Sequence, residues 1–172
     1  MGFFRKMFGK DDTAEQMVGS TAPASDATLG TVHYDPKLVD SLLGDHSRLG
    51  NMYSRIGMLA KNGEFAEVRT LLAHFKSSLQ AHILTENVRF YSYLEKSMAG
   101  DSENARTIHE FRRDMNTIAR EVVNFVKTWQ NSQFTTAAER QQFGADYDKI
   151  GELLEQRLDS EENSLYPLYM AP

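Results

Sequence analysis

Two stretches of the chain share a spacing that suits metal binding. The first places Glu86 four residues after His82, and the second places Glu161 four residues after Arg157. On a helix, residues four apart lie on one face, one turn apart. An imidazole and a carboxylate presented together can bind a metal ion, and carboxylates that face each other from two helices form buried two-metal sites in helix bundles. Because the second copy has arginine in place of histidine, its role is ambiguous.

The composition narrows the classes of function. With 172 residues and 41% hydrophobic residues, the chain is long enough for one domain with a core. Its net charge of −5 argues against direct nucleic-acid binding, which normally needs a basic face. The absence of cysteine excludes disulfides, thiolate metal sites and iron–sulfur clusters.

Targeting and catalytic signals are also missing from the sequence. There is no secretory h-region, no N-myristoylation pattern and no apolar run of about 20 residues that could span a membrane. We therefore expect a cytoplasmic protein without a transmembrane segment. No nucleophile–base pair or cofactor loop favours a hydrolase or a transferase, so whether the chain is an enzyme stays open.

The chain divides into a predicted tail and a predicted helical unit. Residues 1–32 carry Gly, Ser, Thr, Ala and Asp with little periodicity after a basic, Phe-rich start, which predicts a flexible tail and linker. In residues 33–172, apolar residues recur three and four apart in four segments, at about 36–62, 64–98, 102–129 and 137–166. Their short connections predict an all-α fold, an up-down-up-down four-helix bundle.

Capping signals set the expected helix ends. Asp35 followed by Pro36 predicts the start of the first helix, which Gly63 should end. Thr136 and Glu139 have the spacing of a capping box, which predicts the start of the last helix.

The heights of the histidines in such a bundle favour one shared site. In antiparallel helices joined by short turns, residues equidistant from a turn lie at the same height, given a rise of about 1.5 Å per residue. Turns near 62–63, 100 and 133 place five candidate ligands in one slab, a turn or two thick: His46, His82, Glu86, His109 and Glu161. A single buried histidine is more often a hydrogen-bonded core residue, and an exposed His–Glu pair would show the same spacing. Only the shared height favours a metal site.

Other residues near these positions are interpreted differently. His74 is predicted to lie in the core or beside a ligand. Glu110 and Glu162 are interpreted as solvated charges. Tyr91 and Tyr166 are predicted to pack at the end of the bundle.

These residues resemble the hemerythrin-like (HHE cation-binding) family over about residues 36–170. The resemblance rests on Asp45-His46, His82-x-x-x-Glu86, His109, and Glu161-Glu162 with Leu165-Tyr166-Pro167. It implies a non-haem iron centre in a four-helix bundle, which binds O2, senses oxygen, NO or redox state, or handles iron. It also implies that Glu86 and Glu161 bridge two irons. His46 and His82 would then bind one iron and His109 the other.

Two departures from the family pattern leave the number of metals open. Arg157 stands where the family has a histidine, and Arg113 stands one turn after His109, where a second histidine often occurs. A guanidinium is always cationic and repels a nearby cation. The alternatives are a di-iron site, a single-metal site with two histidines and two carboxylates that suits Fe or Mn, and a metal-free site in which Arg157 pairs with Glu86 or Glu161.

A weaker resemblance suggests a different function. The stretches 38–53 and 150–161, Arg157 included, are similar to the first and last helices of the Rsd/AlgQ regulators. Those proteins share the bundle fold and sequester a sigma factor of RNA polymerase. The alternative expectation is therefore a regulator that binds a sigma factor with little or no metal chemistry.

Overall fold

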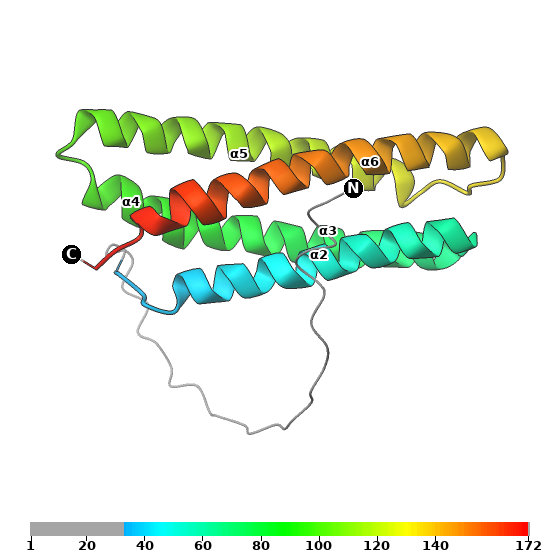
Figure 1. Ribbon diagram of the computed structural model, residues 1–172, viewed down its shortest axis with the longest axis horizontal. Coiled ribbons are helices and arrows are strands. Elements are labelled where there is room, and N and C mark those ends of the chain that lie inside the picture. Colours follow the sequence, from blue (N-terminus) through cyan, green and yellow to red (C-terminus); the bar gives the residue numbers. More distant parts are fainter. Residues whose placement is uncertain (1–32, 172) are drawn as a thin grey trace, which may run out of the picture.

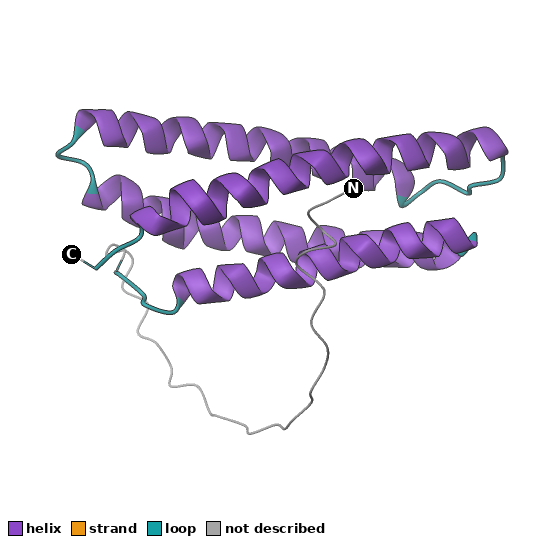
Figure 2. Cartoon of the chain, in the orientation of Figure 1, coloured by secondary structure: helices purple, strands orange, loops and turns teal. Residues whose placement is uncertain are grey.

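The chain folds into a bundle of long antiparallel helices. The computed structural model describes residues 33–171, and the predicted tail of residues 1–32 lies outside them. Within this part of the chain every regular element is helical (Figure 2). The long helices are α2 (Leu38–Asn62), α3 (Phe65–Thr85), α5 (Ser102–Trp129) and α6 (Ala137–Ser160). They run alternately up and down the bundle (Figure 1). The prediction of an all-α, up-down-up-down bundle is confirmed.

Short segments extend two of these helices. The segments are η1 (Glu86–Tyr91) and α4 (Ser92–Ser97) after α3, and η2 (Glu161–Leu165) and η3 (Tyr166–Leu168) after α6. Both η1 and η2 are π-helical, and each begins at one of the two candidate carboxylates. π-Helical turns are rare and frequently occur at functional sites. The two carboxylates therefore lie where the backbone departs from α-helical spacing.

The helix ends largely follow the capping signals. α2 begins at Leu38, slightly later than expected, because the Asp35 side chain caps a backbone N–H in the turn before the helix. Gly63 ends α2 with φ 80°, in the left-handed conformation that glycine adopts without strain. Thr136 and Glu139 form the predicted capping box at the start of α6.

A layer of polar residues separates two apolar clusters in the core. One cluster, with Phe75 and Phe143, fills the end of the bundle where α2 joins α3. The other, with Phe90 and Leu165, fills the end where α4 leads to α5. The buried polar side chains of the described residues lie between the clusters: His46, His82, Glu86, Arg157 and Glu161. Buried charges are costly unless they are paired or bind a metal, so this layer needs a specific explanation.

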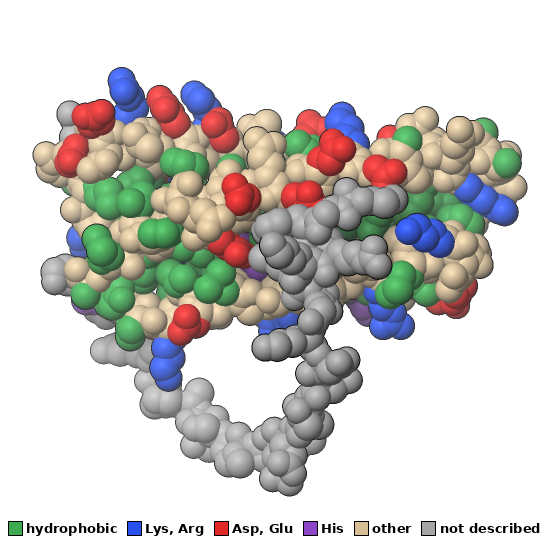
Figure 3. Space-filling view, viewed as in Figure 1, with side chains coloured by type: hydrophobic (Ala, Val, Ile, Leu, Met, Phe, Trp, Pro, Cys, Tyr) green, Lys and Arg blue, Asp and Glu red, His purple; other side chains and the backbone are tan. Residues whose placement is uncertain are grey.

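The outer surface is ordinary for a helical bundle. Figure 3 shows one face, on which charged side chains of both signs stand over the helices and hydrophobic side chains show between them. Among the described helices, none combines the length and the apolar character needed to cross a membrane.

Candidate metal centre

Four side chains from three parts of the bundle, namely α2, the junction of α3 with η1, and η2, converge in the polar layer. His46 comes from α2, His82 from the last turn of α3, and Glu86 and Glu161 from the first residues of η1 and η2. One nitrogen or oxygen of each side chain lies within 4.8 Å of the corresponding atoms of the others. All four residues are buried, and the most exposed, His46, is only 5% accessible.

The helical spacing explains how His46 reaches this layer. It lies between Leu42 and Leu49, each of which is about one turn away on the same buried face of α2. His82 follows Leu79 on α3 in the same way, and Glu86 follows one turn later. The apolar periodicity that builds the core thus also aims these polar side chains inward.

His46 Nε2 lies at the centre of the group. It is 3.2 Å from His82 Nε2 and 3.2 Å from Glu161 Oε2. The hydroxyl of Tyr166 is 3.1 Å from the same nitrogen, and His82 Nε2 is 3.5 Å from Glu86 Oε2. Three polar groups therefore surround His46 Nε2, and Glu86 joins them through His82.

The contacts of the two rings fix their protons in the absence of a metal. His46 Nδ1 is 2.8 Å from Glu162 Oε1, and a carboxylate oxygen accepts, so this nitrogen donates. Burial alone would lower the pKa of His46, but Glu161 and Glu162 outweigh it and raise the pKa to about 9. Burial, followed by the neighbouring His46 and Arg157 charges, lowers the pKa of His82 to about 2. His46 is therefore the cationic ring and His82 the neutral one, which accepts through Nε2.

Arg157 supplies a second cation beside the carboxylates. One guanidinium nitrogen, Nη2, pairs with Glu86 and lies 2.8 Å from Glu161 Oε1. The other, Nη1, donates to the Met115 carbonyl of α5 at 2.7 Å. Burial works against the charge of Arg157, but Glu161 and Glu86 outweigh it and raise the pKa. Arg157 thus bridges the two carboxylates as a permanent cation.

Glu86 and Glu161 differ in the hydrogen bonds that they accept from residues other than Arg157. Tyr166 donates to Glu86 Oε1 at 2.8 Å. Burial, followed by the nearby Glu161, raises the pKa of Glu86 to about 7, while Arg157 and Tyr166 oppose the shift. Among the described residues, neither oxygen of Glu161 accepts a well-aligned hydrogen bond, and the buried Tyr91 hydroxyl has no hydrogen-bond partner. Glu161 therefore meets its cationic neighbours, Arg157 and His46, through ion pairs that leave its oxygens able to accept a further bond.

A comparison with protein families agrees with this geometry. The Hemerythrin HHE cation binding domain matches residues 37–169, which is most of the chain. The chain belongs to the hemerythrin HHE cation-binding family. No curated protein and no solved structure matches it.

The donor set fits the cation that the hemerythrin family implies. Histidine nitrogens and carboxylate oxygens bind a divalent ion such as zinc at about 2.0–2.2 Å, which places adjacent ligand atoms about 3.0–3.5 Å apart. The separations of 3.2 Å and 3.5 Å at His46 and His82 fall in this range. The oxygens of Glu161 make ion pairs but accept no well-aligned hydrogen bond among the described residues, so they can supply a further metal-binding atom. His46, His82, Glu86 and Glu161 could therefore hold a metal ion.

The structure does not bring His109 to this group. His109 is exposed on α5, because it directly follows the buried Ile108 and successive helical residues point about 100° apart. The shared height of the histidines is not enough to predict a ligand, since height does not determine in which direction a side chain points around the helix axis. Arg113 is exposed on the same helix, and His74 is exposed on α3, so the expectation that His74 lies in the core or beside a ligand is wrong.

Two residues at the hemerythrin site were missed by sequence reasoning. Glu162, interpreted as a solvated charge, is only 22% exposed at its side chain and contacts His46. Asp45 is 18% exposed, and its Oδ2 lies 3.6 Å from His82 Nδ1. The feature of the sequence that could have identified them is their position, since each is next to a candidate ligand. Sequence alone could not show that each faces a histidine on a different helix.

Proposed function

We propose that this hemerythrin domain binds a single iron ion, or manganese, between His46, His82, Glu86 and Glu161, and that it serves as an oxygen-, NO- or redox-sensing or iron-handling module. The observation that carries the proposal is the buried group of two imidazoles and two carboxylates whose donor atoms lie within 4.8 Å of one another. Mixed nitrogen and oxygen donors suit iron and manganese.

Arg157 supports one ion instead of two. A guanidinium cannot lose its charge, and this one contacts both carboxylates on the side where the family resemblance implies a second iron. Two carboxylates with one arginine and one divalent ion carry a net charge of about +1 before the nearby Glu162 and Asp45 are counted. A second divalent ion would add repulsion and would find no second pair of histidines, because His109 is exposed.

The protein residues have separate tasks in this proposal. When bound, the ion would supply a redox-active centre able to take a small exogenous ligand. His46 must release its Nε2 proton to solvent to bind the ion, and Glu161 Oε2, which is 3.2 Å from that nitrogen, can then face the same ion. Tyr166 holds Glu86, and the two apolar clusters exclude bulk water from both ends of the layer.

A small cavity beside the two histidines supports a role with a diatomic ligand. The cavity, of about 20 Å³, has mostly apolar walls that include Gly50, Tyr53 and Leu154, and it reaches His46, His82 and Arg157. A space of this size holds a molecule about as large as water. Such a pocket suits O2 or NO better than a larger organic substrate.

Metal analysis tests the proposal. The protein is purified aerobically and also reconstituted anaerobically with Fe(II), and metal content is measured by mass spectrometry. We expect saturation at about one equivalent, without the absorption bands of a coupled two-iron centre. The variant His46→Gln should lose the ion, while His74→Gln, which alters an exposed histidine, should keep it. Less than a tenth of an equivalent after reconstitution would refute the proposal.

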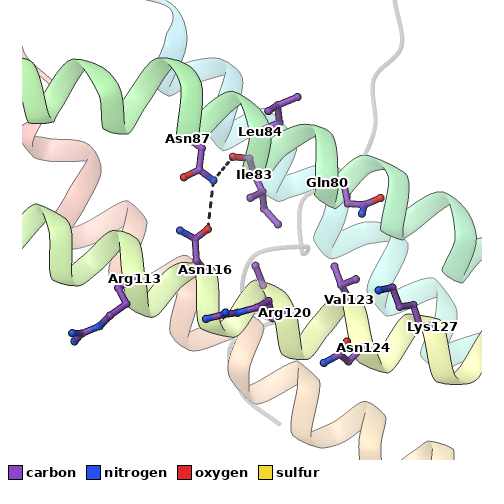
Figure 4. Close-up of a pocket in the computed structure, with 11 residues that line it drawn as sticks. Gln80, Ile83, Leu84, Asn87, Arg113, Asn116, Arg120, Val123, Asn124 and Lys127 are labelled. Carbon is purple, nitrogen blue, oxygen red and sulfur yellow. Dashed lines mark hydrogen bonds between the residues drawn. The ribbon is translucent and has the colours of Figure 1, made fainter.

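A second candidate function is regulation by protein binding, as in the Rsd/AlgQ regulators. Arg157 and the cationic His46 together already balance the two buried carboxylates, so the fold does not depend on a metal for charge neutrality. A groove on the outside of the bundle, between α3 and α5, offers a surface for a partner (Figure 4).

The groove combines apolar and cationic side chains. It encloses about 990 Å³ and has Ile83, Leu84 and Val123 in its lining. Its charged lining residues are all cations, Arg113, Arg120 and Lys127, spaced seven residues apart along α5. A row spaced in this way follows one face of a helix over about 21 Å. These features suit an acidic amphipathic helix, such as one presented by a sigma factor.

A pull-down with purified sigma factors at low salt tests this second function. Retention of a sigma factor that is lost in the variant Arg120→Glu/Lys127→Glu would support it. Arg106→Glu, on an exposed part of α5 outside the groove, is the matched control. Failure to retain any sigma factor at low salt would remove this candidate.

A further inference from the structure

We propose that Asp45 and Glu162 are positioning residues that hold the two histidines with Nε2 toward the bound ion. Each carboxylate faces the Nδ1 side of a buried imidazole from outside the donor group. A hydrogen bond on one ring nitrogen fixes the tautomer and orientation of the ring and makes the other nitrogen a better donor. This inference rests on the proposed metal-binding function, but half of its test does not need a metal.

Glu162 holds His46 through a short contact. The distance from Glu162 Oε1 to His46 Nδ1 is 2.8 Å, which is the length of a charge-assisted hydrogen bond. The opposite nitrogen, Nε2, is the atom that lies between His82 and Glu161. The ring also stacks on Tyr166, with centroids 5.5 Å apart and planes 19° apart, so its rotation is restricted on a second side.

Asp45 holds His82 through a longer contact. Asp45 Oδ2 is 3.6 Å from His82 Nδ1, and among the described residues that nitrogen has no hydrogen-bond partner within normal distance. His82 Nε2 accepts from the His46 ring, so the single proton of the neutral His82 ring belongs on Nδ1, where Asp45 is the nearest acceptor. Arg48 pairs with the other carboxylate oxygen, Oδ1, and leaves Oδ2 directed toward the ring. A small shift of the ring, as on metal binding, would close this contact.

Each of the two carboxylate–histidine contacts joins two different helical elements. Asp45 is adjacent to His46 on α2 but faces His82 of α3. Glu162 is adjacent to Glu161 on η2 but faces His46 of α2. Each carboxylate therefore ties the element that carries one ligand to the element that carries another. This arrangement restrains the His46 ring before an ion binds and would restrain the His82 ring once the Asp45 contact closes.

Amide substitutions test the positioning role with little change in shape. We expect Glu162→Gln and Asp45→Asn each to weaken Mn(II) or Fe(II) binding about 10- to 100-fold, the range typical of lost partners behind metal-binding histidines. Asp45→Glu, which keeps a carboxylate, should recover part of the loss. Glu152→Gln and Asp40→Asn remove the same charge from exposed positions on α6 and α2 and should leave affinity unchanged.

Nitrogen-15 NMR of the histidine rings in the metal-free protein provides the second measurement. In the parent protein we expect a proton on Nδ1 of both His46 and His82. Asp45→Asn should move the His82 proton to Nε2 in a detectable fraction of molecules, since the amide competes poorly as an acceptor, and the control variants should not.

The two measurements separate the possible failures. If the parent binds no metal, the proposed function fails, and the tautomer measurement still decides whether the carboxylates orient the rings. If metal affinity falls while both tautomers stay unchanged, the carboxylates act only through charge and the positioning role is overturned. Affinity within twofold of the parent for both amide variants would also overturn it. A folded state of each variant is verified from its histidine spectrum and its helical circular dichroism.

Discussion

Replacing Arg157 with histidine separates the roles of this residue most clearly. Arg157 is 4% exposed, and the two carboxylates it contacts are fully buried. Removing one partner of a buried ion pair costs about 3–5 kcal/mol, because the other charge is left unpaired. For a domain of this size each kcal/mol changes Tm by about 2–4 °C, so metal-free Arg157→His should melt about 6–20 °C below the parent.

Metal should reverse this loss if the substitution restores a second ligand set. Neutral imidazole one turn before Glu161 supplies a nitrogen donor and removes a fixed positive charge. A ligand that binds only the folded state at 1,000 times its Kd adds about 4 kcal/mol, which is enough to offset the expected loss. We therefore expect Fe(II) to raise the Tm of the variant back toward that of the parent, and the stoichiometry to rise toward two.

Arg157→Met is the matched control for this experiment. Methionine removes the charge and fills similar space but offers no nitrogen ligand, so this variant should lose stability and still bind no more than one ion. The assay is a thermal melt with and without Fe(II), together with metal content by mass spectrometry. If Arg157→His binds no more metal than Arg157→Met and only melts lower, Arg157 is a structural partner of the carboxylates, and the protein-binding function gains over metal binding.

Three further predictions follow from the site and the packing. Because the pKa of His46 is raised to about 9, metal binding must displace a proton from this residue at neutral pH. In competition titrations, the affinity for Mn(II) should therefore rise about tenfold per pH unit from pH 7 to 9. An affinity that does not change with pH would contradict this. In the metal-free protein the raised pKa of His46 contributes stability that is complete below pH 6.5 and is lost as the pH rises through about 9, by an amount on the order of 3 kcal/mol. Urea unfolding should show this decrease in the parent and a much weaker one in His46→Gln. Gly57→Ala should destabilise the fold by about 1–3 kcal/mol in the same assay, because the new Cβ would lie 2.5 Å from the Tyr147 hydroxyl. In the control Gly144→Ala the new Cβ meets no atom within 4 Å, so this variant should be as stable as the parent or more stable.

Much of the fold follows from local sequence rules. The periodicity of the apolar residues, the capping box at Thr136 and the left-handed Gly63 act within one or two turns, so the sequence is sufficient to predict them. The same periodicity places His46 and His82 on buried faces. These parts of the prediction needed no knowledge of how the helices pack against one another.

The failures arise where the direction of a side chain matters. His109 shares the height of the other candidates, but its position after Ile108 turns it to solvent. Glu162 has the composition of a surface residue, and only the crossing of η2 near α2 brings it to His46. Whether Arg157 only repels a metal ion or also pairs with the buried carboxylates depends on interatomic distances, which a sequence does not contain.

The two π-helical turns have a consequence for how this chain can change during evolution. In η1, the buried Glu86 and Tyr91 are five residues apart, and the buried Glu161 and Tyr166 repeat that separation after α6. Between the first pair, Val88 is 57% exposed, so most substitutions there should be tolerated within about 0.5 kcal/mol. Deleting Val88 is a different kind of change. It would convert the turn to α-helical spacing, in which Glu86 and Tyr91 become four residues apart and still share a face, so the later residues of that helix keep their direction relative to the ligands. The position should thus accept both nearly any side chain and the loss of one residue, and an alignment with a relative that lacks the π-turn needs a gap of one residue here.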